Sequence, residues 1–166
     1  MTVKTGIINS KDDERYTPKK VVDFFGPFDY DPATIVERAA LFGIENFDTK
    51  ETNGLTTDWT KYKRIWINPP FTMKNAFVEK AFDSYRKCEN DIYILIPNDY
   101  LYTKGFFKLV EKYNMKYKIF IPKRRIKFEK NGNDAWNNPN FACAIIHPCE
   151  ANTFEHIDID NGTKLC

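Results

Sequence analysis

Several features that would place the chain in a common class are missing from its sequence. None of the four cysteines belongs to a C-x-x-C pair, and the chain has only two histidines, so we expect no structural metal site. No apolar run is long enough to cross a bilayer, and the first 18 residues carry no apolar segment typical of secretion signals. We therefore expect a cytoplasmic protein with reduced thiols, no metal and no membrane contact.

The residues that build a hydrophobic core are plentiful. The 166 residues are 42% hydrophobic and 16% aromatic, a composition that argues against disorder. This length suits one domain. We therefore predict a single globular domain over residues 1–166.

Charge is distributed unevenly, although the formal net charge is only +2. The net charge is −4 over residues 1–60, +10 over residues 61–130 and −4 over residues 131–166. Residues 112–130 alone hold eight basic side chains and one acidic one. Lysine and arginine attract phosphates regardless of sequence, so the middle segment is a candidate nucleic-acid surface; a solvated strand-rich surface is the alternative.

Hydrophobic spacing and turn residues predict alternating strands and helices. Helices are expected over residues 17–26, 33–43, 75–87 and 105–113. Strands are expected over residues 28–31, 45–48, 64–67, 92–96, 117–121, 125–128 and 141–146, and a polar loop over residues 51–59. This order predicts an α/β fold: a mainly parallel sheet with a C-terminal antiparallel hairpin at one edge and helices on both faces.

Two strand ends carry unusual chemistry at the edge where open α/β sheets bind ligands. One is the acidic segment 29–33, and the other is the tetrapeptide N-P-P-F at 68–71. The Asn68 side-chain carbonyl and the backbone carbonyl of Pro69 can accept the two hydrogens of an exocyclic aromatic amine while Phe71 stacks on its ring. The alternative is a strand-terminating turn with an aromatic plug.

An ordered series of short motifs resembles the adenine-specific, S-adenosylmethionine-dependent DNA methyltransferases, and most closely the small phage-encoded enzymes of the Dam type. The motifs are Y-T-P at 16–18, F-D-Y-D-P-A at 28–33, N-G-L at 53–55 with D-W at 58–59, I-W-I-N-P-P-F at 65–71, L-I-P at 95–97 and R-R-I-K-F at 124–128. The likeness covers residues 14–147. It implies a Rossmann-like class I methyltransferase fold, methylation of the N6 amine of a flipped DNA adenine, and a phage protein at work in the bacterial cytoplasm.

The resemblance also implies a set of site residues. Catalysis is expected from Asn68, Pro69, Pro70 and Phe71. The S-adenosylmethionine cofactor is expected against Tyr16, Thr17, Pro18, Asp29, Asp31, Pro32, Ala33, Asp48 and Asp58. Two departures from the family pattern stand out: no G-x-G follows Asp31, and Asn53 occupies a position that is usually acidic, which makes Asp58 the alternative partner of the cofactor's adenine.

Carboxylates near strand ends suit a cofactor that carries a sulfonium and an ammonium group. Alternation places Asp29 and Asp31 on one side of an extended segment, and Asp31 is the favoured ligand because it leads into the helix; a helix cap is the alternative role. Asp48 is a candidate for the ribose hydroxyls, or a surface acid. Phe47 and Trp59 are candidates for stacking on purine rings, or core residues.

DNA contacts are predicted from the basic middle segment and from the loop over residues 131–140. The candidates are Lys74, Lys123, Arg124, Arg125, Lys127, Lys130 and Trp136. The loop either enters a groove of the duplex or is only a surface turn. Because 166 residues leave no room for a separate target-recognition domain, we expect a short recognition sequence, relaxed specificity or a homodimer.

Three alternatives stay open at this point. N-P-P followed by an aromatic residue also serves glutamine-amide methylation in release-factor modifying enzymes, which the chain otherwise resembles less. An RNA substrate satisfies the same charge pattern as DNA. The missing glycine-rich turn supports a third alternative, a nucleic-acid-binding module on a catalytically decayed methyltransferase fold, which cofactor binding would discriminate.

Overall fold

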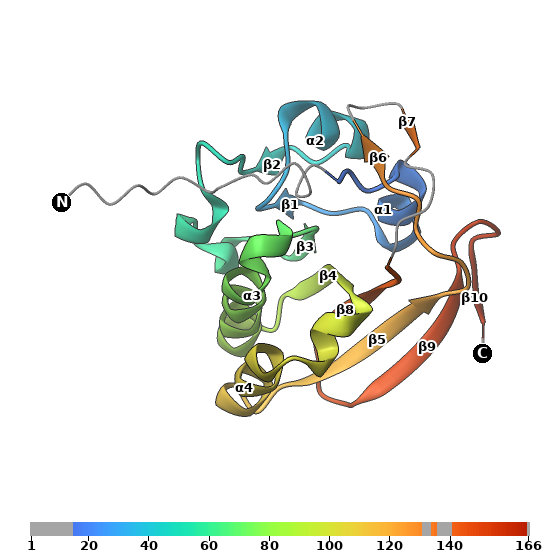
Figure 1. Ribbon diagram of the computed structural model, residues 1–166. Coiled ribbons are helices and arrows are strands. Elements are labelled where there is room, and N and C mark those ends of the chain that lie inside the picture. The colour runs from blue at the N-terminus through green and yellow to red at the C-terminus, as the bar shows by residue number, and fades with distance from the viewer. Residues whose placement is uncertain (1–14, 131–133, 136–140, 166) are drawn as a thin grey trace.

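The computed structural model describes residues 15–130, 134–135 and 141–165, and Figure 1 shows their elements gathered around one sheet. The helices are α1 (Lys19–Phe25), α2 (Val36–Phe42), α3 (Lys74–Cys88) and α4 (Lys104–Lys112). The strands are β1 (Tyr30–Asp31), β2 (Asn46–Phe47), β3 (Arg64–Ile67), β4 (Asp91–Pro97), β5 (Lys116–Pro122), β6 (Glu129–Lys130), β7 (Asp134–Ala135), β8 (Cys143–Cys149), β9 (Thr153–Asp158) and β10 (Thr163–Leu165). The predicted polar loop holds two short 3-10 turns, Gly54–Thr56 and Trp59–Lys61.

Eight strands form the main sheet, in the order β10-β9-β5-β8-β4-β3-β1-β2. The strands β2, β1, β3 and β4 are parallel, β8 runs antiparallel to both of its neighbours, and β9 is parallel to β5. At one edge, β10 turns back against β9. The α/β prediction of a mainly parallel sheet with a C-terminal antiparallel hairpin is therefore confirmed, and the topology is consistent with the methyltransferase fold that the motifs imply.

Alternation along the strands builds one core on each face of the sheet. Along β3, Ile65 and Ile67 pack with residues of α3 and α4, whereas Trp66 packs with residues of α1. All three side chains are completely buried. Figure 1 shows α3 and α4 together on one side of the strands and α1 and α2 together on the other, so the prediction of helices on both faces is confirmed.

Local sequence signals fix the ends of several helices. Gly43 ends α2 in the left-handed conformation with φ 68°, which a glycine adopts without strain, as its place after the apolar run predicts. Thr103 caps α4, because its hydroxyl accepts a hydrogen bond of 3.2 Å from the Phe106 amide. The longest helix, α3, has 15 residues. Within the described ranges no helix combines the length and apolar character needed to span a membrane.

The strand prediction for residues 125–128 is wrong. Ile126 and Phe128 are buried in the core beside α1 and Lys127 is exposed, but the segment is not paired with another strand. An extended segment that lies across a core has the same period of two as a paired strand, which explains the error. Pairing starts only at Glu129, where β6 meets β7.

The edge hairpin is made of strands that the sequence pattern does not reveal. The strand predicted over residues 141–146 begins at Cys143 and lies inside the sheet, between β4 and β5. The hairpin at the edge is β9 with β10. Because Phe154 is 67% exposed and polar residues surround it, β9 has no apolar run to predict it from.

Candidate functional site

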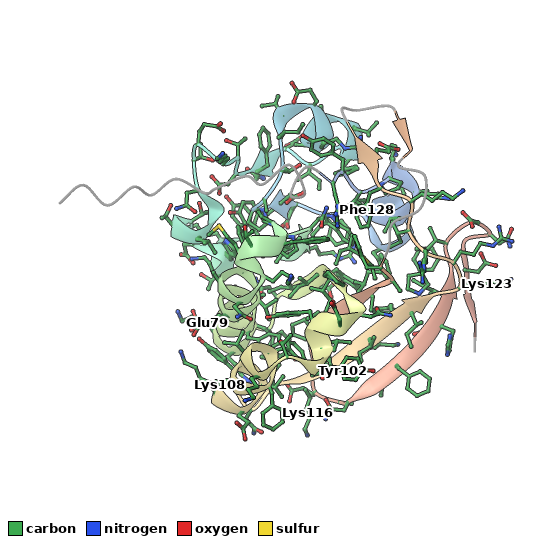
Figure 2. All side chains as sticks on the ribbon, in the orientation of Figure 1. Glu79, Tyr102, Lys108, Lys116, Lys123 and Phe128 are labelled. Atoms are coloured by element: carbon green, nitrogen blue, oxygen red, sulfur yellow. The ribbon has the colours of Figure 1, made fainter. Side chains whose placement is uncertain are left out.

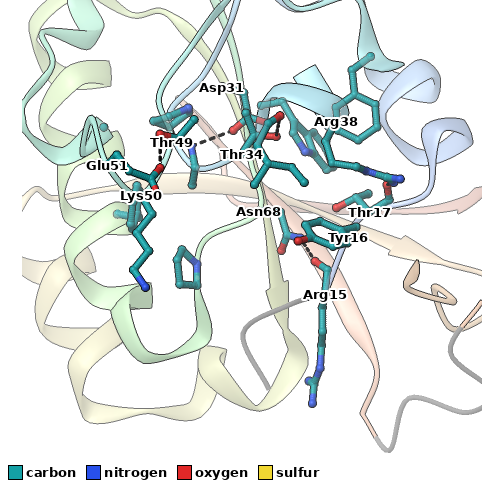
Figure 3. A pocket seen from close by; sticks show the side chains of 18 residues that line it. Arg15, Tyr16, Thr17, Asp31, Thr34, Arg38, Thr49, Lys50, Glu51 and Asn68 are labelled. Atoms are coloured by element: carbon teal, nitrogen blue, oxygen red, sulfur yellow. Dashed lines mark hydrogen bonds between the residues drawn. The ribbon is translucent and has the colours of Figure 1, made fainter. Parts of the chain in front are cut away.

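A cavity of about 330 Å³ opens at the carboxyl ends of β1 and β3, where the fold rule expects a ligand (Figure 3). Its wall includes the side chains of seven residues that the sequence predicts as site residues, namely Tyr16, Thr17, Asp31, Pro32, Ala33, Asn68 and Pro70. The wall also includes Arg15, Arg38 and Glu51, which the sequence does not single out. The cavity therefore brings the Y-T-P, F-D-Y-D-P-A and N-P-P-F motifs together in space.

Asp31 is a buried acid at this cavity. Its residue surface is 2% exposed, and its carboxylate accepts a hydrogen bond of 3.0 Å from the Ala33 amide. Burial raises the pKa of Asp31 to about 7, and the bond from Ala33 opposes this shift only in part. Over the described ranges, no basic side chain forms an ion pair with Asp31. The site therefore holds a carboxyl group whose ionised form a bound cation would favour.

Tight packing replaces the missing glycine-rich turn after Asp31. Gly54, from the N-G-L motif, lies so close that a Cβ atom added to it would be 2.1 Å from the Pro32 carbonyl oxygen. The Gly54 carbonyl in turn accepts a hydrogen bond of 2.8 Å from the Trp59 indole. Asn53 takes a positive φ of 57° and its side chain accepts a bond from the Leu55 amide, which shapes the turn. The glycine that the turn requires thus comes from a segment further along the chain.

A strap formed by residues 15–17 crosses one side of the cavity. Tyr16 pairs with Glu129 through two backbone hydrogen bonds of 3.0 and 2.9 Å. Arg38, whose side chain is 5% exposed, forms an ion pair of 2.6 Å with Glu129 and also donates to the Thr17 carbonyl. The sequence analysis does not single out Arg38. α2 carries two charged residues, Glu37 and Arg38, and only Arg38 is buried, so residue type alone does not distinguish them.

Three of the predicted cofactor acids have other contacts. The Asp29 carboxylate accepts hydrogen bonds from the Lys63 and Arg64 amides, at 3.0 and 2.8 Å, and so anchors the start of β3. Asp48 accepts bonds of 2.6 Å from the Tyr30 and Thr57 hydroxyls. Although burial opposes the change, these bonds lower the pKa of Asp48. Asp58 caps the short 3-10 turn that follows it. None of the three lies in the described wall of the cavity.

Asn68 and Phe71 both contact Arg15. The Asn68 amide nitrogen donates a hydrogen bond of 2.8 Å to the Arg15 carbonyl oxygen, so its carbonyl oxygen is the acceptor that remains for a ligand amine. The Phe71 ring lies in a neighbouring hollow with Lys74 and Tyr100. Pro69 is buried beneath the turn. The tetrapeptide thus joins the cavity wall to an aromatic surface outside it.

The basic residues gather in a separate groove of about 310 Å³ between α1 and the end of β9. Lys123, Arg124, Arg125 and Lys127 line it, as does Lys20. Two of the cations face carboxylates: Lys123 pairs with Asp158 at 3.2 Å, and Lys20 pairs with Asp160. Of the other predicted DNA contacts, Lys74 lies beside Phe71, Lys130 belongs to β6, and Trp136 lies outside the described residues.

Comparison with known proteins identifies the family. The model of the family "DNA N-6-adenine-methyltransferase (Dam)" matches residues 4–159. A DNA N-6-adenine-methyltransferase of Escherichia phage T1 is 34% identical over 87 residues, which is 50% of this chain and 35% of the relative. One of Haemophilus phage HP1 is 34% identical over 88 residues, which is 53% of this chain and 49% of the relative. The chain therefore matches about half or less of the length of these relatives.

Proposed function

Because the chain belongs to the Dam family of DNA N-6-adenine-methyltransferases, we propose that it transfers a methyl group from S-adenosylmethionine to the N6 amine of adenine in DNA. One observation carries the proposal: a buried carboxyl, Asp31, for which the described residues supply no ion-pair partner, shares a cavity wall with the Asn68 amide. The first group suits a cationic cofactor and the second suits an aromatic amine. A methyl transfer needs both in one place.

The cavity suits S-adenosylmethionine in charge and in size. A ligand ammonium or sulfonium beside Asp31 would favour the ionised carboxylate and supply the charge partner that the described part of the site lacks. The volume of about 330 Å³ lies in the range of small-molecule sites, roughly 300–1,000 Å³. When bound, the cofactor would supply an electrophilic methyl group. Tyr16 and Thr17 would cover it, and residues 32–34 would hold its amino-acid end.

The ribose contact belongs to Glu51 rather than to Asp48 in this proposal. Glu51 follows β2 as Asp48 does, but it lines the cavity. The Thr49 hydroxyl donates a hydrogen bond of 2.7 Å to the Glu51 carboxylate and orients it. The Asp48 carboxylate is engaged by two hydroxyls of the protein. Vicinal hydroxyls are ordinary partners of an acid after the second strand of such sheets.

Asn68 and Pro69 would bind the target amine. The amide nitrogen of Asn68 is taken by the Arg15 carbonyl, so the Asn68 oxygen and the Pro69 carbonyl can accept the two N6 hydrogens. This arrangement directs the nitrogen lone pair towards the cofactor side of the cavity. The proton leaves to solvent after the bond to carbon forms, so no strong base is required. Phe71 would stack on the flipped base.

DNA would reach the site through flipping of one adenine. The groove of Lys123, Arg124, Arg125 and Lys127 provides cations for backbone phosphates. Lys74, whose ammonium lies beside Phe71, would contact a phosphate near the flipped nucleotide. Roles of Lys130 and Trp136 and assembly as a homodimer remain predictions from the sequence.

The test is an isotope assay with a matched pair of variants. We would incubate the protein with tritiated S-adenosylmethionine and unmethylated duplex DNA, and then digest the DNA to nucleosides. We expect label in N6-methyldeoxyadenosine for the wild type and for Asn152→Asp, an exposed position outside the site where aspartate keeps the acceptor for the Tyr117 amide, and none for Asn68→Ala. Cofactor binding and the melting temperature should be the same in all three proteins.

Each other outcome contradicts a defined part of the proposal. Activity in Asn68→Ala would refute the role of the amide. A wild type that binds the cofactor but leaves DNA unlabelled would point to RNA or a protein amide. A wild type that does not bind the cofactor would point to a non-catalytic nucleic-acid module.

A further inference from the structure

One residue contacts both groups that the proposed function assigns to the target base. The backbone carbonyl of Arg15 accepts the hydrogen bond from Asn68. The guanidinium carbon of the same residue lies 4.8 Å from the centroid of the Phe71 ring. Arg15 therefore lies where an adenine held by Asn68 and stacked on Phe71 would have to lie.

The aromatic surroundings of Arg15 make a corner for one planar group. Phe141 meets Phe71 edge to face, with centroids 5.2 Å apart and planes at 76°, and the Arg15 guanidinium lies 4.5 Å from the Phe141 centroid. A guanidinium is flat and stacks on aromatic faces much as a nucleobase does. The ring centroid of a base stacked on Phe71 would lie about 4.5–7 Å from the Phe71 centroid. The Arg15 guanidinium already fills that space. The Lys74 ammonium also lies 5.1 Å from the Phe71 centroid, but it is the Arg15 carbonyl that accepts the hydrogen bond from Asn68.

The backbone at Arg15 is held independently of its side chain. The next residue, Tyr16, is paired with Glu129 through two backbone bonds, and Arg38 ties Glu129 to the Thr17 carbonyl. The Arg15 carbonyl can therefore keep its bond to Asn68 while the long side chain turns away through its own torsions. The carbonyl and the guanidinium thus have separable roles.

We propose that Arg15 is a positioning residue with these two roles in the base site. Its carbonyl fixes the orientation of the Asn68 amide, and its guanidinium occupies the Phe71 face until a flipped adenine displaces it. In this position the guanidinium keeps the corner between Phe71 and Phe141 from closing. An incoming purine therefore only has to displace a planar cation and does not have to reopen a closed site. This inference rests on the proposed function, because it takes the base to be an adenine bound between Asn68 and Phe71.

The direct test measures stacking without catalysis. The probe is 2-aminopurine deoxyriboside, a fluorescent adenine analogue that is quenched when it stacks. Arg15→Ala removes the competing guanidinium, so we expect the quenching to reach half-saturation at a three- to tenfold lower probe concentration than in the wild type. Arg15→Lys keeps a cation without the planar fork and should lie between the two. In a Phe71→Ala background, Arg15→Ala should have no effect.

A second measurement uses the competing cation itself. Guanidinium chloride should weaken probe binding to Arg15→Ala at millimolar concentrations at which sodium chloride of equal ionic strength does not, because free guanidinium can enter the vacated corner. The wild type should respond to both salts alike. In steady-state methylation of single-stranded DNA, Arg15→Ala should lower KM, because the competing guanidinium is gone, and should change kcat less.

Two results would overturn the inference. Equal probe affinity in the three Arg15 proteins would show that the side chain does not compete for the Phe71 face. Weaker binding in Arg15→Ala that Arg15→Lys restores would show that Arg15 attracts the ligand instead of holding its place. A failure of the proposed function gives a different pattern: no DNA methylation by the wild type, whatever the probe reports.

Discussion

Replacing Asp31 with asparagine should remove a pH-dependent loss of stability from the unliganded protein. Burial raises the pKa of this carboxyl from 3.8 to about 7 in the folded state. The folded protein therefore holds a proton that the unfolded chain releases between these values, and its stability falls as the pH rises through them. A shift of about three units corresponds to about 4 kcal/mol. Asparagine has nearly the same shape and does not titrate.

The assay is urea unfolding of both proteins, without cofactor, at pH 4 and at pH 8. Burial of the asparagine amide lowers the unfolding free energy of the variant by the same amount at both pH values. The informative quantity is therefore how the difference in unfolding free energy between the two proteins changes with pH. Relative to Asp31→Asn, the wild type should lose about 4 kcal/mol of unfolding free energy between the two pH values, as an upper limit. Groups with lowered pKa values, such as Asp48, change both proteins equally and cancel.

Asp29→Asn is the matched control for this prediction. Its carboxylate accepts two backbone hydrogen bonds at the start of β3, so the substitution should destabilise the fold while cofactor affinity is kept. Asp31→Asn should show the opposite combination, with cofactor binding lost at pH 8. The same pH dependence in the wild type and in Asp31→Asn would refute the reasoning, because it would mean that burial does not raise the pKa of Asp31.

Other predictions follow from the strap, the stacking face and the basic groove. Arg38→Ala leaves Glu129 without its ion-pair partner and should cost about 3 kcal/mol of unfolding free energy together with cofactor affinity, as measured by calorimetry. Phe71→Ala should lower methylation turnover by about 10- to 100-fold through lost stacking, whereas Phe71→Tyr should stay within a few-fold; equal losses would contradict stacking. Replacing Arg124 and Lys127 together with alanine should reduce the slope of log affinity for DNA against log salt by about 2, and an unchanged slope would remove the groove from the DNA surface.

The sequence predicts the ends of a helix or strand well where proline or glycine directly follows an apolar run. The strand over residues 64–67 is predicted to the residue because Pro69 and Pro70 end it, and Gly43 fixes the end of α2. Prediction fails where a pattern has two physical causes. The alternation at 125–128 reflects burial without pairing, and no local pattern marks the exposed strand β9.

The same limit applies to the site. Alternation places Asp29 and Asp31 on one side, yet only the second lines the cavity, because the first is used by the amides at the start of β3. Arg15 and Arg38 depend on contacts with residues 53 and 91 positions away, Asn68 and Glu129, which spacing along the chain cannot reveal. The motifs thus predict the chemistry of the site, and the tertiary contacts decide which carboxyl and which cations take part.

The place of β8 in the sheet has a consequence for how the aromatic corner of Phe71 and Phe141 is completed. This strand fills the gap between β4 and β5 and pairs with both, although it follows both of them in the chain. Until β8 is in place, the edges of β4 and β5 that it covers are unpaired, and contacts of such long sequence separation form slowly. Phe141, which packs against Phe71, lies just ahead of β8 and arrives with it. The pairing of β8 therefore also brings Phe141 to Phe71, so the aromatic corner is complete only when the sheet is closed.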